Sequence, residues 1–330
     1  MSIEVSVIIP AYNTEQYIAK AINSALGQTL ANIEVIIVDD CSIDNTVAVV
    51  ESFKDPRLRL IKNQTNMGAG GARNKAIAAA QGKWIAVLDS DDWYAPQRLE
   101  VLTTVAEQKN ADLIADDSFL IEDGVSTPWS TIISESGQKL TTITQFDAAQ
   151  FVLSDVEGKP GLHLGFTKPL FRREFLIDNQ IQYQNIKVTQ DFWFDMQCFL
   201  HGAKFFLVPQ PYYFYRARPG SLVSSNKIER LDQECEAIAA FMVHEIYLQQ
   251  NSDVLQALTI KLKETRKWLD YYLVIEPLKQ GKILACLQGI AAKPIVLLYL
   301  LGHIPKLLVR RLERILLTDT LSYQKKMFKV

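Results

Sequence analysis

Three carboxylates follow the apolar run Trp84–Leu88 in the segment Asp89-Ser90-Asp91-Asp92. An apolar run of this length predicts a buried parallel strand, and open α/β sheets bind ligands in the crevice beyond the carboxyl ends of such strands. Mg²⁺ is usually held by one or two carboxylates together with phosphate oxygens. The segment therefore predicts a divalent cation that holds a diphosphate, and so a nucleotide-linked substrate. A solvated turn is the less favoured alternative, because three unpaired carboxylates this close repel one another.

A second pair of carboxylates, Asp39 and Asp40, follows the apolar segment Glu34–Val38. The carboxyl ends of parallel strands lie at one edge of a sheet, so we expect this pair near the first cluster. An ionised Asp only accepts hydrogen bonds, which suits Asp40 to a nucleotide base that presents an N–H donor. The alternative is that both residues merely cap a turn.

The glycine-rich segment Asn66–Gly71 precedes Arg73. Glycines let a backbone approach a ligand closely. The segment has neither the G-x-G-x-x-G spacing of a dinucleotide site nor the lysine of a P-loop, which argues against an NAD or ATP site. For Arg73, a solvated helix position is the alternative to contact with a ligand.

The elements that would position these residues alternate between strand and helix. Apolar strands are predicted at residues 5–9, 34–38, 58–61, 84–88 and 111–117. Helices are predicted after Thr14 and Asp44, which would cap them, over residues 72–80 and from Pro96. This alternation predicts a doubly wound, mostly parallel α/β sheet with right-handed crossovers.

The pattern changes beyond residue 117. The Ser/Thr-rich stretch 118–144 predicts loops with at most a hairpin, followed by helices at residues 145–153 and 191–201 and a strand at residues 205–208 that ends before Pro209. From residue 226 onward the periodicity is helical. We therefore expect a nucleotide-sugar-binding domain over residues 1–222 and a helical C-terminal region over residues 223–330.

Charge is distributed unevenly over the 330 residues, whose formal net charge is −2. Residues 301–330 carry seven Lys or Arg against two acidic residues, a local charge of +5. Within them, residues 304–316 form a basic amphipathic pattern, which favours contact with an anionic membrane surface over packing on the protein itself.

No apolar run reaches the roughly 20 residues that span a bilayer, and no basic patch with interleaved aromatics indicates nucleic acid.

The four cysteines are far apart and form no C-x-x-C pair, and the N-terminus lacks the pattern of a secretion signal. Neither a disulfide framework nor a zinc site is indicated. We expect a reduced, cytoplasmic setting, with peripheral contact at the inner face of the cell membrane.

Four ordered motifs resemble the inverting family 2 glycosyltransferases with the GT-A fold. They are Val5–Asn13, Val38–Thr46, Asn66–Asn74 and Asp89–Asp92. The similarity is closest to bacterial enzymes that build exopolysaccharide or lipopolysaccharide repeat units. It implies a Rossmann-like GT-A domain that moves a single hexose from a nucleotide diphosphate sugar to a hydroxyl of a glycan acceptor, which by family analogy is a lipid-linked oligosaccharide.

The resemblance places the nucleotide. It implies that the residues lining the base, the ribose or the loop near the nucleotide are Pro10, Ala11, Tyr12, Asp40, Asn66, Gly68, Arg73, Asp89 and Ser90. Among them Asp40 resembles the carboxylate that reads uracil, which favours a UDP-sugar, with UDP-glucose and UDP-galactose as the first donors to test. Asp89 resembles the carboxylate that contacts ribose or a metal-bound water.

The resemblance also assigns the metal and the base. Asp91 resembles the principal ligand of Mg²⁺ or Mn²⁺, and Asp92 either supports it or caps the helix after Pro96. The family carries its base in a Glu-Asp pair at the start of a helix, where this chain has Gln190 and Asp191. Asp191 therefore resembles the general base, worth about 10²–10⁴-fold in rate, while a role for Gln190 is in doubt. For Asp191, a helix cap without catalysis is the alternative.

Arg216, Arg218 and Ser221 lie in a segment that follows the last predicted strand of the domain. In relatives a similar segment closes the donor site, and arginines there would bind phosphate oxygens; an exposed basic loop is the alternative. His163 is a weaker candidate for contact with the acceptor, and a structural histidine explains it equally well. The chain lacks the Q-x-x-R-W motif of processive members, so we expect one sugar to be added per encounter.

Two other classes of function are weighed against this one. A nucleotidyltransferase would carry a basic, glycine-rich loop after its first strand, where this chain has Ala11–Thr14. A catalytically degenerate glycan-binding or scaffold module is favoured by Gln190, while the intact carboxylates at positions 40, 91 and 191 speak against it.

Overall fold

The computed structural model describes residues 2–184, 186, 188–218, 227–244, 251–297 and 299. Its contacts divide the chain into two compact units. The first contains residues 1–154 and 161–218, and the second contains residues 155–160 and 219–330. The boundary expected at residue 222 and the amphipathic segment 304–316 lie outside the described residues.

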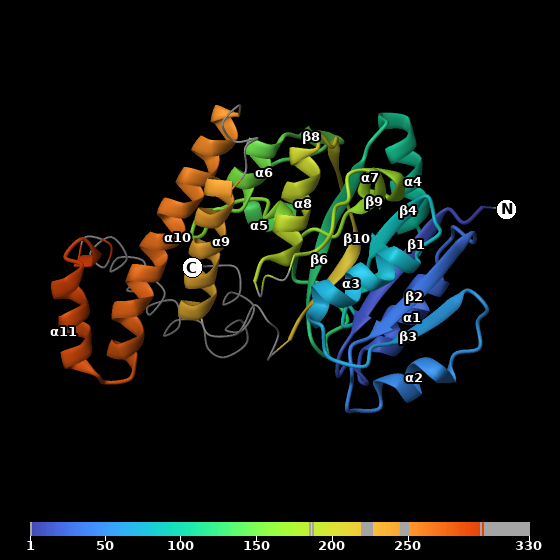
Figure 1. The fold of residues 1–330 in the computed structure, drawn as a ribbon, viewed down its shortest axis with the longest axis horizontal. Coiled ribbons are helices and arrows are strands. Elements are labelled where there is room, and N and C mark those ends of the chain that lie inside the picture. The colour runs from blue at the N-terminus through green and yellow to red at the C-terminus, as the bar shows by residue number, and fades with distance from the viewer. Residues whose placement is uncertain are drawn as a thin grey trace. The chain divides into compact units, whose positions relative to one another are not determined.

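The first unit is built on a ten-stranded sheet in the order β3-β2-β1-β4-β9-β6-β10-β5, with β7 paired to β6 and β8 to β10. The strands, which Figure 1 labels except for the two-residue strands β5 and β7, are β1 Val5–Ala11, β2 Ile33–Asp39, β3 Leu58–Lys62, β4 Trp84–Val87, β5 Trp93–Tyr94, β6 Leu113–Glu122, β7 Ser130–Thr131, β8 Thr144–Phe146, β9 Leu170–Arg172 and β10 Phe205–Ala217. Strands β3, β2, β1 and β4 are parallel to one another, as are β6 and β10. The doubly wound, mostly parallel sheet predicted from the alternation is confirmed.

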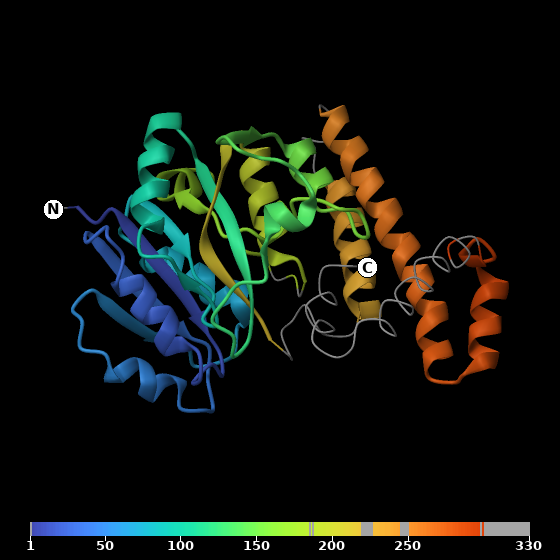
Figure 2. The ribbon, with the colours of Figure 1, turned by 180° about the vertical axis from the view of Figure 1, so that it is seen from behind.

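Helices cover both faces of this sheet. They are α1 Ile18–Leu26, α2 Thr46–Ser52, α3 Gly68–Ala79, α4 Arg98–Lys109, α5 Ile132–Ser136, α6 Ala148–Ser154, α7 Arg173–Asp178 and α8 Gln190–Leu200, with a 3₁₀ turn η1 at Leu164–Phe166. The apolar side chains of α1 and α4 form one core cluster with alternate residues of β1, and Figure 2 shows these two helices in front of the sheet. Helix α3 packs against β1 and β2 and lies in front of them in the opposite view of Figure 1.

Two predicted helix starts have different outcomes. Helix α1 has Tyr17 as its N-cap, without a side-chain hydrogen bond, so the Thr14 cap is wrong; the Thr14 carbonyl instead accepts the N–H of Ile18. Asp44 does stabilise the start of α2, because its Oδ1 accepts the N–H of Thr46 at 2.9 Å. The difference is that a turn over residues 15–17 separates Thr14 from the first helical residue, Ile18.

Two strands extend beyond the ends that the sequence predicted. Strand β6 continues to Glu122 because Ser118–Glu122 pairs with Tyr213–Ala217 of β10. Strand β10 passes through both prolines, with register shifts around Pro211 that accommodate the missing N–H groups. The pair of β6 and β7 is the hairpin allowed within residues 118–144.

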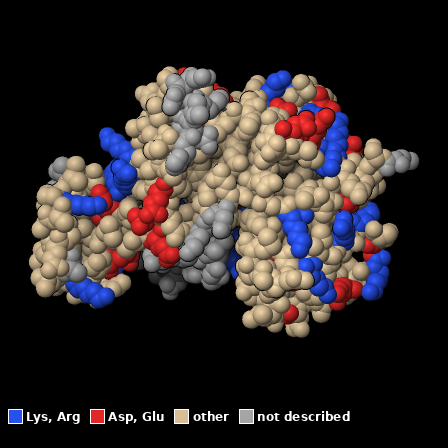
Figure 3. Space-filling model, in the orientation of Figure 1, with Lys and Arg blue, Asp and Glu red and all other residues tan. Residues whose placement is uncertain are grey.

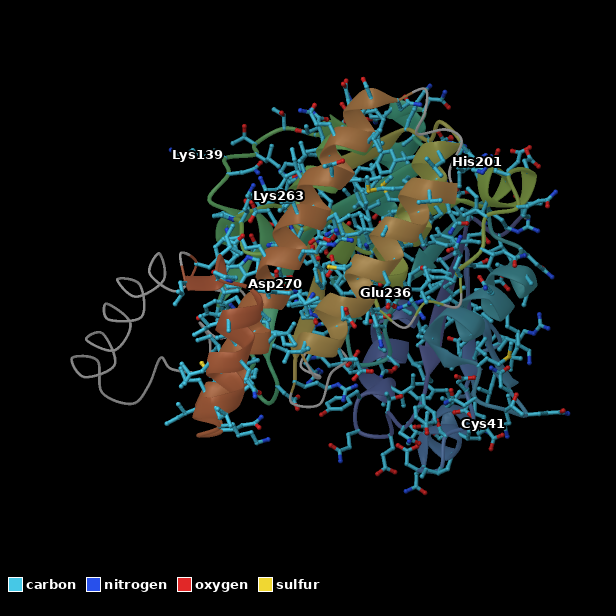
Figure 4. The ribbon with its side chains drawn as sticks, turned by 60° about the vertical axis from the view of Figure 1, so that its left-hand side comes forward. Cys41, Lys139, His201, Glu236, Lys263 and Asp270 are labelled. Carbon is cyan, nitrogen blue, oxygen red and sulfur yellow. The ribbon has the colours of Figure 1, made fainter. Side chains whose placement is uncertain are left out.

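The second unit is helical in its described part, as predicted. It contains α9 Lys227–His244, α10 Ser252–Lys279 and α11 Ile283–Ala292. Buried ion pairs tie the segment 155–160 to it: Lys261 Nζ lies 3.0 Å from Glu234 and 3.3 Å from Asp155. A cavity of about 290 Å³ in this unit is lined by residues that include Glu236 of α9 and Asp270 of α10, both labelled in Figure 4. No helix among the described residues is long and apolar enough to cross a membrane.

Candidate functional site

The ends of β1 and β2 lie side by side at the carboxyl edge of the sheet. The register pairs Ala11 with Asp39, and the Asp40 N–H donates to the Ala11 carbonyl at 2.8 Å. Pro10 and Ala11 are buried, while Tyr12 is 49% exposed. Of these three candidates, Tyr12 therefore offers the ring that a flat base can contact.

Asp40 is a buried carboxylate that fixes the start of α3. Its Oδ1 accepts hydrogen bonds from Asn63 Nδ2 at 2.7 Å and from the Met67 N–H at 2.8 Å. Asn66 Nδ2 donates to the Asp40 carbonyl at 3.1 Å. The turn interaction that was the alternative for Asp40 is thus present; it occupies Oδ1, and no described residue donates a hydrogen bond to Oδ2.

The glycine segment is helical rather than a loop. Helix α3 begins at Gly68, whose φ is +74°, so the loop expected up to Gly71 ends three residues earlier. Arg73 on this helix is only 5% exposed, and the solvated position offered as its alternative is wrong. Its guanidinium points to Asp89, which lies beyond β4.

Arg73 and Lys168 together bridge Asp89 and Asp191. Arg73 Nη2 lies 2.7 Å from Asp89 Oδ1, and Arg73 Nη1 lies 3.1 Å from Asp191 Oδ1. Lys168 Nζ lies 2.5 Å from Asp191 Oδ2 and 3.1 Å from Asp89 Oδ2. The structure therefore brings two predicted site carboxylates, 102 positions apart in the sequence, into one cluster of balanced charge.

The opposite charges in this cluster compensate for the effect of burial on the pKa values of its members. Burial opposes ionisation of Asp89, but Lys168 and Arg73 lower its pKa well below the ordinary value. Burial likewise opposes the charge on Lys168, but Asp191 and Asp89 raise its pKa well above the ordinary value. Oppositely charged groups at this distance favour each other's ionised forms, so Asp89 and Lys168 each stabilise the charge of the other.

Lys168 was not predicted as a site residue, and the register of β9 explains its position. Strand β9 is antiparallel to β4 and pairs Leu170 with Ala86. Lys168, two residues before Leu170, therefore lies beside Leu88, next to Asp89. A three-residue strand inserted between two parallel ones leaves no periodic signal in the sequence, so this neighbour could not be found from pattern alone.

Asp91, the predicted metal ligand, is paired with a cation of its own chain. Its Oδ2 lies 2.6 Å from Arg218 Nε. Among the described residues no group of three or more His, Cys, Asp or Glu side chains is placed to hold a metal ion. A single carboxylate still fits Mg²⁺ or Mn²⁺ where substrate phosphates complete the shell, and Asp91 is suited to this because both oxygens of Asp89 are already ion-paired.

Asp92 supports the site rather than the helix after Pro96. Helix α4 has Gln97 as its N-cap, so the capping alternative is wrong. The Tyr213 hydroxyl donates to Asp92 Oδ2 at 2.7 Å and accepts the Asp89 N–H at 3.3 Å. Burial, with Asp91 and Asp89 nearby, raises the pKa of Asp92 well above its ordinary value.

Arg216 lies in β10 and not in a loop after it. Its backbone N–H donates to Asp92 at 2.8 Å, its Nε to the Asp91 carbonyl at 2.8 Å, and its Nη1 pairs with Asp123 at 2.7 Å. These contacts fix the acidic segment from the side of β10. Arg218 follows directly after the strand, and Ser221 lies outside the described residues.

Asp191 is in the first turn of α8. The preceding Thr189 has a φ of +54°, a conformation that is uncommon for a β-branched residue and that turns the chain into the helix. Gln190 Nε2 donates to the Ile186 carbonyl at 2.5 Å, so this residue has a structural role. One turn later, Asp195 is 1% exposed, and burial together with Asp191 raises its pKa well above the ordinary value.

Two further candidates are Ser90 and His163. Ser90 is buried at 7% exposure. His163 is partly buried, has a φ of +46° and packs edge-on against Phe166. The roles of both residues stay predictions.

Comparison with known proteins shows the family of this chain. The sequence profile described as "Glycosyl transferase family 2" matches residues 6–178. The chain belongs to glycosyl transferase family 2. It is 32% identical over 314 residues to the succinoglycan biosynthesis protein ExoO of Rhizobium meliloti (strain 1021), covering 94% of this chain and 87% of that protein.

A second relative matches a shorter region. It is the Escherichia coli protein named UDP-Glc:alpha-D-GlcNAc-diphosphoundecaprenol beta-1,3-glucosyltransferase WfgD, 44% identical over 106 residues, which covers 32% of this chain and 42% of that one. Among solved structures, the mannosyltransferase PcManGT of Pyrobaculum calidifontis, in complex with GDP-Man and Mn²⁺, matches with a TM-score of 0.60 at 17% identity and covers 93% of this chain and 81% of that one. The predicted GT-A fold is confirmed.

Proposed function

We propose that this glycosyltransferase moves a single hexose from a UDP-sugar to a hydroxyl of a lipid-linked glycan, in the synthesis of a cell-surface polysaccharide. The relatives ExoO and WfgD, by their names, act in such synthesis or on such acceptors. The observation that carries the proposal is the shared pairing of Asp89 and Asp191 with Lys168, which joins the donor edge of the sheet to the candidate base.

In the proposed reaction Asp191 takes a proton from the acceptor hydroxyl. The resulting oxygen nucleophile attacks the anomeric carbon from the side opposite the diphosphate, the bond to the diphosphate breaks, and the configuration inverts. Asp40 and Tyr12 bind the base, and Asp89 orients the ribose side. One displacement per encounter makes the enzyme non-processive.

Asp91 would hold the divalent cation of this reaction. When bound, Mg²⁺ or Mn²⁺ supplies positive charge that stabilises the departing diphosphate. Arg218, next to Asp91, supplies a further positive group for phosphate oxygens. The segment with Ser221 that follows it is the proposed cover of the donor.

We also propose peripheral contact with an anionic membrane, through the segment 304–316 and through α11, which precedes this segment in the sequence. The exposed apolar side chains Ile283, Leu284 and Leu287 of α11 are 63%, 71% and 57% exposed. No Asp or Glu occurs between Glu276 and Glu313, while that stretch holds six Lys or Arg. At the left edge of Figure 3, where α11 lies, the surface is mostly uncharged, with lysine or arginine at its margins and acidic side chains farther toward the centre of the view. An exposed apolar helix in a stretch of chain without acidic residues suits an anionic lipid surface.

The test is release of nucleoside diphosphate from a panel of nucleotide sugars, with Mn²⁺ and a synthetic lipid diphosphate-linked sugar as acceptor. We expect metal-dependent release of UDP together with a glycosylated lipid, and loss of both in Asp91→Ala and Asp191→Asn. Donor binding without release would favour a degenerate binding module. Pyrophosphate release from a nucleoside triphosphate and a sugar phosphate would favour a nucleotidyltransferase. Either result would overturn the proposal.

A further inference from the structure

We infer that Lys168 is a positioning residue of the transfer reaction, which holds Asp191 in a fixed relation to the donor carboxylate Asp89. The inference rests on the proposed function, because it assigns a role at the same site. Lys168 belongs to none of the four motifs that indicate the family.

The four charged side chains form a closed ring. Lys168 Nζ pairs with Oδ2 of both carboxylates, at 2.5 Å from Asp191 and 3.1 Å from Asp89. Arg73 pairs with Oδ1 of both carboxylates, at 3.1 Å from Asp191 and 2.7 Å from Asp89. Each carboxylate is thus held by two cations from different elements, which restricts its rotation more than a single pair would.

The two cations do not act on Asp191 equally. Lys168 forms a hydrogen bond with Oδ2, whereas Oδ1 is buried and has no hydrogen-bond partner in the described part of the chain. Because Oδ1 is closed to solvent, an acceptor that reaches Asp191 meets Oδ2. Lys168 therefore holds the oxygen that takes the proton in the proposed reaction.

Lys168 is itself fixed from the other end. Its side chain is 8% exposed, and a lysine is almost never buried to this extent unless it is paired. Its carbonyl accepts a hydrogen bond from Arg98 Nη2 at 2.6 Å, and the fully buried Arg98 is paired with Asp116 at 2.7 Å. The backbone and the ammonium of Lys168 are both held in place, so Lys168 is a rigid support for Asp191 and not a flexible surface contact. We therefore expect that removal of the Lys168 side chain changes the position of Asp191.

Other charged or titratable groups also face Asp191, and they contribute to the pH dependence that the experiment below measures. They are Arg73 on α3, Asp89 after β4, Tyr183 and, one helical turn along α8, Asp195. Arg73 and Lys168 are both paired with Asp191, but only Lys168 hydrogen-bonds it. Removal of Lys168 therefore leaves Asp191 beside one cation instead of two.

The experiment compares Lys168→Met, Lys168→Arg and the control Lys62→Met, whose exposed lysine pairs with Glu51 at 2.5 Å outside the site. Steady-state transfer is measured from pH 5 to 9. We expect Lys168→Met to lower kcat about 10²-fold, the loss that a displaced catalytic group produces, with the donor KM changed less than threefold. The acidic limb of its kcat profile moves to higher pH, Lys168→Arg recovers most of kcat, and Lys62→Met matches the unaltered protein.

The contrary results are distinct. A kcat within twofold of the unaltered protein in Lys168→Met would overturn the inference. An unshifted acidic limb, with Lys168→Arg as defective as Lys168→Met, would assign Lys168 to stability alone. If Lys168→Met does not fold, Lys168→Gln replaces it, since it removes the charge and keeps a donor. Absence of transfer by the unaltered protein would instead contradict the proposed function, and the inference with it.

Discussion

Arg218 Nε lies 2.6 Å from Asp91 Oδ2, so the carboxylate proposed to bind the metal is paired with the arginine proposed to bind the diphosphate. The two side chains are one quarter and one fifth exposed. A cation and Arg218 would therefore compete for the same oxygen until the donor provides phosphate oxygens for both. This relationship predicts that metal binding and donor binding support each other.

The first prediction concerns Arg218→Ala. Removing the guanidinium frees Asp91, so Mn²⁺ binding without nucleotide should tighten about two- to fivefold, the worth of a partly exposed ion pair. Transfer activity should fall, because a diphosphate contact is lost. Titration calorimetry with Mn²⁺ measures the first effect, and Arg57→Ala, which breaks the pair with Asp55 elsewhere on the surface, is the control. Unchanged or weaker Mn²⁺ binding would contradict the competition.

The second prediction concerns Gln190→Glu, which restores the acidic pair of the family. Glu cannot donate to the Ile186 carbonyl as Gln190 Nε2 does, and the unsatisfied group costs about 1–3 kcal/mol. We expect a lower midpoint of urea unfolding and no gain in kcat. Gln150→Glu is the control, because Gln150 uses its oxygen to accept the Asp147 N–H. An increase in kcat would show that the departure at position 190 limits catalysis.

The sequence predicted the carboxylates at the sheet edge because each follows an apolar strand, a local pattern. It could not predict their partners. Lys168 reaches Asp89 only because β9 runs antiparallel between β4 and β6, and Tyr213 reaches Asp92 because β10 continues through two prolines. Both depend on pairings between strands that are distant in the chain and, in the case of β9, only three residues long. The same reason explains why Arg216 was expected in a loop.

The third prediction concerns Asp195→Asn. Burial and Asp191 raise the pKa of Asp195, so the folded state resists its ionisation. The unaltered protein has its full stability below the ordinary Asp pKa of about 3.9 and loses stability as pH rises toward the raised value, by up to about 1.4 kcal/mol for each pH unit. The Asn variant escapes this loss. Its advantage in urea midpoint should be absent near pH 4 and grow toward pH 8.

Asp55→Asn provides a control of opposite sign for this titration. A hydrogen bond from Arg57 lowers the pKa of Asp55 to about 2, so the stability from that pairing is present above about pH 4 and is lost as pH falls toward 2. This variant should be less stable than the unaltered protein at neutral pH. An Asp195→Asn advantage that does not depend on pH would show that Asp195 is not held protonated by its surroundings.

The last prediction tests the membrane proposal at α11 through the triple change of Ile283, Leu284 and Leu287 to Ser. Burying one such side chain contributes about 1.5–3 kcal/mol, so the variant should bind vesicles of phosphatidylglycerol at least tenfold more weakly in a sedimentation assay. Binding by the unaltered protein should also weaken as salt rises, because screening reduces the attraction of basic groups to the anionic surface. Ile43→Ser is the control, since Ile43 is 89% exposed in the first unit. Equal vesicle binding, with a change from dimer to monomer instead, would assign this face to a second copy of the chain.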